Sequence, residues 1–202
     1  MTKAARDSLS RAPGKAGVGT VPSTPGQPDM WILVLIEALT FFSYFVVYTY
    51  SYKANSVAFL EAQSHLNLLF GVINTLILLT SSWSIALAVE KSRNGNFSGA
   101  IANVWLTVGC GLTFLALKLY EWSLKIGEGL YFSSNEFFSF YYFLTGMHLL
   151  HVLVGFIVLG VAIYQLSSPR RRSQEIVETC ATYWHMVDFL WVIIFALLYI
   201  MR

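Results

Sequence analysis

Long apolar blocks separated by short polar segments dominate the pattern of this chain. Five blocks are about 20 residues or longer, the length that an α-helix needs to cross the hydrocarbon layer of a membrane. They are Trp31–Tyr52, Leu66–Val89, Ala100–Tyr120, Phe137–Leu166 and Ala181–Met201. Because lipid offers no hydrogen bonds to the backbone, each block must be helical. The pattern predicts an all-α, polytopic membrane helix bundle of five transmembrane helices.

The composition supports this class. Of the 202 residues, 56% are hydrophobic and 12% are charged, whereas soluble domains contain about 25% charged residues. The fourth block is longer than one crossing requires, and its aromatic start, residues 137–143, is typical of a membrane–water interface.

The first 29 residues differ in kind, with Pro13, Pro22, Pro25 and Pro28 and almost no large apolar side chains. Such a segment cannot bury enough apolar surface to offset its chain entropy, so we expect it to be disordered. No apolar core of a cleavable signal peptide precedes Trp31, and the first helix is expected to remain as an anchor. We therefore divide the chain into a disordered cytoplasmic tail (1–29) and a five-helix transmembrane domain (30–202).

Lysine and arginine residues are distributed unequally between the two ends of these helices. One side carries nine: Lys3, Arg6, Arg11, Lys15, Lys91, Arg93, Arg170, Arg171 and Arg172. The other carries four: Lys53, Lys118, Lys125 and Arg202. Because positive loops stay in the cytoplasm, the N-terminus is predicted inside and the C-terminus outside.

The triple arginine has two interpretations. Arg170, Arg171 and Arg172 act either as plain retention charges or as a patch that contacts lipid headgroups. The net charge of +2 gives no indication of a nucleic-acid partner.

Glu37 lies about two turns into the first predicted helix. An ionised carboxylate at this depth is unfavourable, so Glu37 needs a partner or a proton. Two hypotheses stay open: a functional carboxyl that exchanges protons or senses lipid headgroups, and a protonated acid that holds a neighbouring helix.

Three histidines and one aspartate lie within the last two blocks. His148 and His151 are three residues apart on one helix face, and His185 and Asp188 repeat that spacing. These residues could ligate a metal or a haem iron. Hydrogen bonding between helices, with Asp188 accepting from a histidine, explains them without a metal and is the favoured hypothesis.

Two further features receive structural interpretations. Lys118 and Glu121 are expected to form an ion pair at the outer membrane–water interface. Cys110 and Cys180 show no CxxC spacing and are expected to be small packing residues rather than a disulfide.

Several segments resemble the cytochrome c oxidase subunit 3 family of the haem-copper oxidases. The similarity runs from about Trp31 onward. It rests on Glu37 with Phe41 and Phe42, on residues 73–82, on Glu121-Trp122 with Gly127–Gly129, and above all on residues 145–152 and 183–191.

The resemblance implies an accessory subunit in a bacterial inner (plasma) membrane, without an active site or cofactor of its own. Haem and copper would lie in partner subunits, and this chain would pack on the catalytic subunit I, bind phospholipid in a cleft and support proton uptake and durability. Glu37 would lie near subunit I, and His148, His151, His185 and Asp188 would make contacts between helices.

Two departures from the family pattern affect this interpretation. Longer members have seven helices, and the two that are absent here form one wall of the lipid cleft. Many members also have glycine where Leu149 stands, and Leu149 with Asn135–Phe138 resembles the branch associated with bacterial nitric oxide reductases. A general oxidase is favoured, with the nitric oxide reductase branch as the alternative.

A small transporter is an alternative from another class. It would predict an internal repeat or broken helices near the membrane midplane. No repeat is evident, and all five prolines lie outside the predicted spans.

Overall fold

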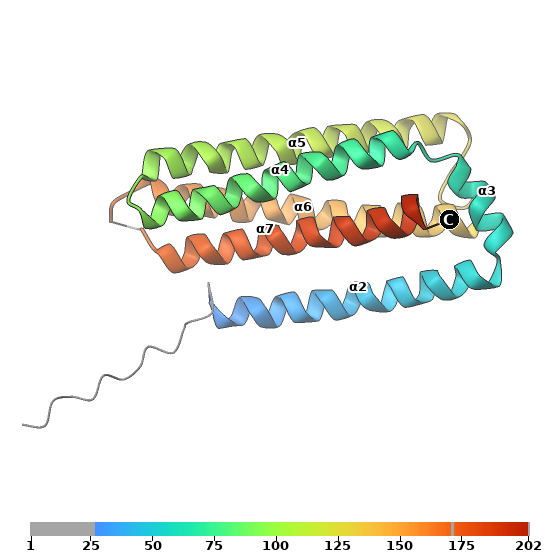
Figure 1. Cartoon of the computed structure of the whole chain (residues 1–202), viewed down its shortest axis with the longest axis horizontal. Helices are drawn as coiled ribbons and strands as arrows, with labels where there is room; N and C mark the ends of the chain where they lie inside the picture. The colour runs from blue at the N-terminus through green and yellow to red at the C-terminus, as the bar shows by residue number, and fades with distance from the viewer. Residues whose placement is uncertain (1–26, 171, 202) are drawn as a thin grey trace, which may run out of the picture.

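A computed structural model describes residues 27–170 and 172–201 and consists there of helices (Figure 1). They are α2 (Pro28–Ala54), α3 (Ser56–Ser64), α4 (Leu68–Arg93), α5 (Phe97–Gly127), α6 (Glu136–Ser167), α7 (Gln174–Phe195) and a terminal π-helical turn η1 (Ala196–Ile200). Within these described ranges, five helical segments are long and apolar enough to cross a membrane, which confirms the predicted all-α bundle of five spans. The chain is an integral membrane protein.

The helix starts follow from short polar residues in the connections. The side chains of Asn67, Asn96, Asn135 and Ser173 each accept a hydrogen bond from a backbone N–H in the first turn of α4, α5, α6 and α7. Such caps satisfy donors that a helix start leaves free. They also explain why α7 begins at Gln174, seven residues before the predicted block.

The predicted boundary between the tail and the transmembrane domain lies close to the start of α2. This helix begins at Pro28, so residues 28 and 29 are helical, whereas residues 1–26 of the predicted tail lie outside the described residues. The sequence pattern did not predict the short helix α3. It has nine residues, and because nearly half of them are polar, its apolar pattern is too weak to recognise.

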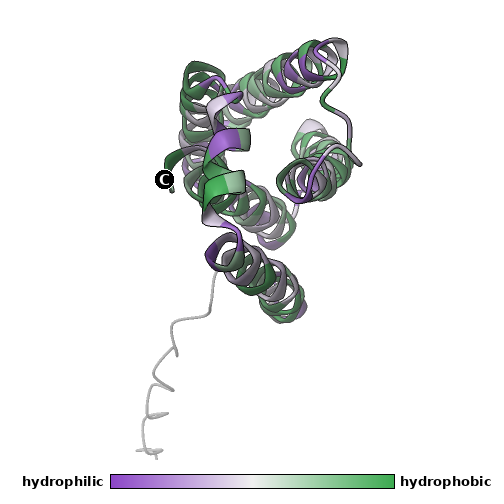
Figure 2. Cartoon of the chain, turned by 90° about the vertical axis from the view of Figure 1, so that its right-hand side faces the viewer, coloured by the Kyte–Doolittle hydropathy of each residue, from purple (hydrophilic) through white to green (hydrophobic). Residues whose placement is uncertain are grey.

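Helices α4 to α7 pack side by side into a bundle, and α2 lies outside them along α7 (Figures 1 and 2). The α4–α5 and α6–α7 connections are at the same end of the bundle as the start of α2, and the C-terminus is at the other end with α3 (Figure 1). Lys91, Arg93, Arg170 and Arg172 therefore gather at one end, which the charge rule assigns to the cytoplasm.

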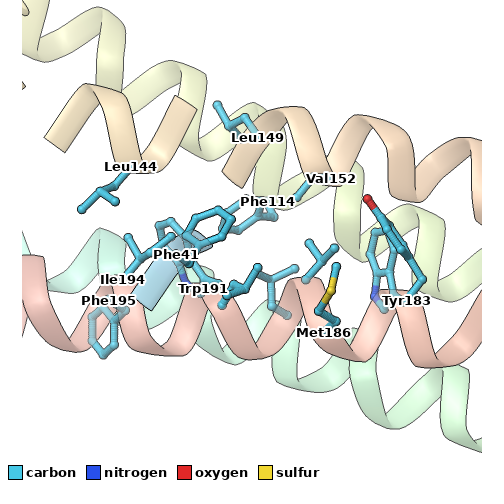
Figure 3. Packing of buried hydrophobic residues seen from close by; sticks show 14 of the residues in the cluster. Phe41, Phe114, Leu144, Leu149, Val152, Tyr183, Met186, Trp191, Ile194 and Phe195 are labelled. Carbon is cyan, nitrogen blue, oxygen red and sulfur yellow. The ribbon is translucent and has the colours of Figure 1, made fainter. Parts of the chain in front are cut away.

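The bundle interior is built from aromatic rings fitted against small residues. Phe114 of α5 and Trp191 of α7 lie edge to face, with ring centroids 4.7 Å apart (Figure 3). The Trp184 indole, which is fully buried, packs against Gly155 and Gly111, where an added Cβ would come within 2.7 Å and 3.0 Å of the ring. Glycine at these two positions lets α5, α6 and α7 approach closely.

The C-terminal π-helical turn is held by a side chain of α3. Gln63 is 2% exposed, and its Nε2 donates to the carbonyl oxygens of Leu198 at 3.2 Å and Met201 at 2.9 Å. Tyr48 of α2 donates its hydroxyl to the Leu197 carbonyl at 3.1 Å. These bonds satisfy carbonyl groups at a helix end.

Gln63→Ala is therefore expected to loosen the C-terminal turn and to destabilise the protein by about 1–3 kcal/mol, because buried carbonyl groups lose their donor. Hydrogen exchange of the amides of residues 196–200 measures this. Ser64→Ala, which removes only an exposed bond to the Glu61 carbonyl, is the control. Equal exchange in the two variants would contradict the role of Gln63.

Candidate functional site

Glu37 and His151 form an ion-pair contact between α2 and α6. Glu37 Oε2 lies 3.2 Å from His151 Nε2, and the two side chains are 27% and 14% exposed. The His151 ring also packs edge to face on Phe41, one turn further along α2, at 5.4 Å between centroids. The structure thus gives the membrane-embedded carboxyl a partner on another helix.

The second nitrogen of His151 determines what this pair can do. Nδ1 lies 2.8 Å from the Met147 carbonyl oxygen. A carbonyl can only accept, so Nδ1 must carry the hydrogen. Nε2 faces the Glu37 carboxyl, so a hydrogen bond between the two groups requires one hydrogen between them, carried either by the carboxyl or by Nε2.

His148 has a different environment from His151, although the sequence places both on one helix face. It is fully buried, and its ring lies 5.5 Å from the Phe114 ring and 5.2 Å from the Trp191 ring between centroids. Within the described part of the chain neither of its ring nitrogens has a hydrogen-bond partner. His148 therefore contacts α5 and α7 through ring packing, whereas His151 contacts α2.

His185 and Asp188 both lie near α4. His185 Nδ1 is 2.6 Å from the Ser82 hydroxyl, and the buried Asp188 carboxyl has Ser82 as a polar neighbour. A bond from a histidine to Asp188, suggested by the sequence, is not found among residues 27–170 and 172–201. The same residues contain no group of three His, Cys, Asp or Glu side chains placed to hold a metal ion.

A buried polar network at the outer half of the bundle was not anticipated. Lys118 and Glu121 form the predicted ion pair at 3.0 Å, but they are 0% and 1% exposed and lie inside the bundle rather than at the membrane surface. Lys118 Nζ also donates to the Tyr199 hydroxyl at 2.8 Å and to the Tyr141 hydroxyl at 3.2 Å. Tyr199 in turn donates to Glu121 Oε1 at 2.7 Å.

The sequence contains a signal for this network that the ion-pair interpretation overlooked. The buried positions of α5 recur at alternating steps of four and three residues, and Lys118 and Glu121 continue that series: Ala100, Val104, Thr107, Gly111, Phe114, Lys118, Glu121 and Lys125. A spacing of three and four keeps residues on one helix face. Both charges therefore belong to the interior face of α5.

The arginines predicted to contact lipid do not share one environment. Arg170 is exposed in the α6–α7 connection, Arg172 lies with its guanidinium carbon 3.6 Å from the centre of the Phe97 ring, and Arg171 lies outside the described residues. Cys110 and Cys180 are both free thiols, as expected; Cys180 is buried and Cys110 is half-buried.

Comparison with known proteins gives a consistent family match. A family model described as cytochrome c oxidase subunit III matches residues 26–202. Cytochrome c oxidase subunit 3 of Thermostichus vulcanus is 35% identical over 132 residues, which cover 64% of this chain and 64% of that protein. The Synechocystis sp. protein of the same name is 29% identical over 87% of this chain and 78% of its own length. Heme-copper oxidase subunit I+III of Aeropyrum pernix is 29% identical over 93% of this chain and 24% of that protein.

Proposed function

Since the chain belongs to the cytochrome c oxidase subunit III family, we propose that it is an accessory subunit of a respiratory haem-copper oxidase in a bacterial inner membrane. The family match along residues 26–202 carries this proposal. The packed interior supports it: aromatic rings and an internally neutralised ion pair fill the bundle, as expected of a scaffold. In this role the haems and copper are held by partner subunits, and this chain adds no cofactor.

The proposed partner is the catalytic subunit I. The name of the Aeropyrum relative joins subunits I and III. Nearly the whole length of this chain aligns to one part of that protein. Helix α2 offers a surface for such a contact, because few of its residues are buried and Leu35, Ile36, Leu39 and Phe42 are exposed. In a membrane these side chains face either lipid or another helix.

Besides the partner subunit, we propose that the chain binds a phospholipid. An apolar groove of about 440 Å³ lies between α2 and α7, lined among others by Trp31, Val34, Phe45, Met186 and Phe189. Its walls suit an acyl chain, because they are almost wholly hydrocarbon.

Co-purification in mild detergent tests the proposed function. A haem-containing subunit I is expected to elute with this chain. A copper-containing subunit II in the same complex would indicate an oxygen reductase, whereas a small c-type cytochrome subunit without copper would indicate the nitric oxide reductase branch predicted from Leu149. Elution of the chain without any haem protein would overturn the proposal and favour the transporter.

Glu37→Gln tests the proposed functional carboxyl. Glutamine keeps the size and a hydrogen bond to His151 but cannot share a proton, so the yield of complex should be unchanged and the free energy of unfolding should change by about 1 kcal/mol or less. The period over which the complex sustains turnover is expected to shorten, as is its rate of proton uptake. Glu61→Gln, an exposed acid of α3, is the matched control. Unchanged turnover lifetime and proton uptake in Glu37→Gln would refute this role.

A further inference from the structure

A polar groove lies between α4 and α7, in the half of the bundle that carries the α4–α5 and α6–α7 connections. Its volume is about 220 Å³, and its polar lining comes from Arg93 of α4 and from Glu178, Thr182 and His185 of α7. Glu178 and His185 are separated by about two helical turns, or about 10 Å along α7. The charge rule assigns this end of the bundle to the cytoplasm (Figure 1). The groove therefore leads from the cytoplasmic surface into the membrane layer, and it has room for several water molecules.

The outer part of the groove is polar and open to water. Arg93 Nε and Nη2 both lie 2.9 Å from Glu178 Oε1, and the Arg93 side chain is 56% exposed. Thr182, one turn deeper on α7, donates its hydroxyl to the Glu178 carbonyl at 3.0 Å, so its oxygen can still accept a hydrogen bond from water. Polar side chains thus follow one another from the membrane surface to His185.

His185 lies at the inner end of the groove. It is half-buried, and its Nδ1 lies 2.6 Å from the Ser82 hydroxyl of α4. Within the described part of the chain Nε2 has no hydrogen-bond partner, which leaves this nitrogen for water in the groove. An imidazole can take up a proton on one nitrogen and release one from the other. His185 therefore connects the groove with Ser82.

The carboxyl of Asp188 is a neighbour of Ser82 on its other side in sequence, three residues after His185 on α7. It is 4% exposed, and neither of its oxygens has a hydrogen-bond partner among residues 27–170 and 172–201. Ser82 is its polar neighbour on α4, and the half-buried Cys110 thiol is the titratable group that faces it from α5. In the same ranges no charged side chain of α2 or α6 pairs with it. An ionisable group placed in this way inside a membrane is costly and points to a function.

We propose that Asp188 exchanges its proton with the cytoplasmic side through Ser82 and His185. A proton from water in the groove binds His185 Nε2, the hydrogen on Nδ1 passes to Ser82 Oγ, and the hydrogen of the Ser82 hydroxyl passes to the Asp188 carboxylate. Each group gains one proton and loses one except Asp188, which keeps it. The reverse sequence releases the proton to the groove.

The route ends at Asp188. One turn further along α7 lies Trp191, whose ring packs edge to face on Phe114 at 4.7 Å between centroids. The fully buried His148 ring packs against both, and neither of its nitrogens has a hydrogen-bond partner within the described residues. This aromatic layer interrupts the chain of polar groups. Asp188 is thus a proton store that communicates with one side of the membrane, and not part of a channel across it.

This inference deepens the proposed support of proton uptake, and its meaning for respiration rests on that proposed function. The exchange itself is a property of this chain and is measured on the purified full-length protein without partner subunits. A chain that exchanges the Asp188 proton but elutes without any haem protein would keep the exchange site and lose the oxidase role.

Infrared spectroscopy at mildly acidic pH tests the exchange. A protonated carboxyl has a C=O stretching band that shifts to lower frequency when O–H becomes O–D, and loss of the band in Asp188→Asn assigns it. We expect the Asp188 band to shift promptly after transfer to D2O. His185→Phe keeps the ring but cannot carry a proton, and it should slow the shift about a hundredfold. Ser82→Ala should slow it similarly.

Ser84→Ala is the matched control, because it removes another hydroxyl of α4, one that donates to the Asn103 carbonyl instead. It should exchange as the unchanged chain does. Ala86→Leu provides a variant outside the relay: this exposed residue lines the groove, so the larger side chain should exclude water and slow the shift without loss of the fold. The thermal midpoint of each variant is recorded as a check on folding.

Four results would each overturn the proposal. They are the absence of an Asp188 band, a band that stays unshifted in D2O in the unchanged chain, an unchanged rate in both His185→Phe and Ser82→Ala, and equal slowing in Ser82→Ala and Ser84→Ala. The first two would make Asp188 either an ionised or a sealed acid with a structural role only.

Discussion

Lys118→Met is expected to lower the free energy of unfolding by about 3–5 kcal/mol, because it leaves the Glu121 carboxylate buried without a cation. The methionine fills the same space, so the loss reports on charge rather than on a cavity. Tyr199 would still donate to Glu121, but one hydroxyl cannot replace an ammonium group that also binds Tyr141 and Tyr199. Unfolding in mixed micelles with rising dodecyl sulfate, followed by tryptophan fluorescence, measures the change.

The same helix provides a matched control. Lys125 pairs with Glu128 at the same i, i+3 spacing and at 2.7 Å, but the Glu128 side chain is 51% exposed. Lys125→Met should therefore be destabilising by about 1 kcal/mol or less. The double variant Lys118→Met with Glu121→Gln should recover most of the loss, since no buried charge is then left unpaired. Similar losses in the two single lysine variants would show that the buried network is not a special source of stability.

Gly155→Val is the other change with a large expected effect, a destabilisation of about 1–3 kcal/mol or more from overpacking. A Cβ at this position would lie 2.7 Å from Trp184 Cζ3 and 2.9 Å from Cε3. The indole cannot move away, because Gly111 of α5 and Phe156 of α6 enclose it. Its Nε1 also donates to the Ser81 hydroxyl at 2.9 Å. The thermal midpoint and the tryptophan emission of the folded protein are the readouts.

Gly160 serves as the control for this change. It lies five residues further along α6 and has no atom within 4 Å of an added Cβ. Gly160→Val should change stability by about 0.5 kcal/mol or less, because valine is a somewhat better helix former than glycine and meets no neighbour. Adding Trp184→Phe to Gly155→Val should restore part of the loss. A Gly160→Val variant as unstable as Gly155→Val would argue against close packing as the cause.

The motif with His148 and His151 illustrates what a local pattern can and cannot predict. Its apolar surroundings correctly indicated a transmembrane helix, and the spacing correctly put the two histidines within one side of that helix. Their partners could not be read from the motif. A rotation of about 60° between positions three residues apart is enough to direct one ring to α5 and α7 and the other to α2.

The Lys118–Glu121 pair shows a second reason for error. The i, i+3 spacing alone predicted the ion pair correctly. Its burial depended on Tyr141 and Tyr199, which are 20 and 78 residues beyond Glu121 in sequence. Charged residues near the end of a membrane helix usually extend to the interface. The spacing along α5 places both charges on its interior face, but it does not identify the distant tyrosines that receive them.

By itself the sequence determined the five membrane helices, because apolar length and the need to satisfy backbone hydrogen bonds in lipid leave no other regular structure. It also indicated the family and the unequal charge of the two ends. The tertiary structure alone decided which polar side chains meet: Glu37 with His151, Lys118 and Glu121 with two tyrosines, Arg172 with Phe97. These contacts join residues far apart in the chain, and their formation depends on how small and aromatic side chains fit between helices, which no local pattern encodes.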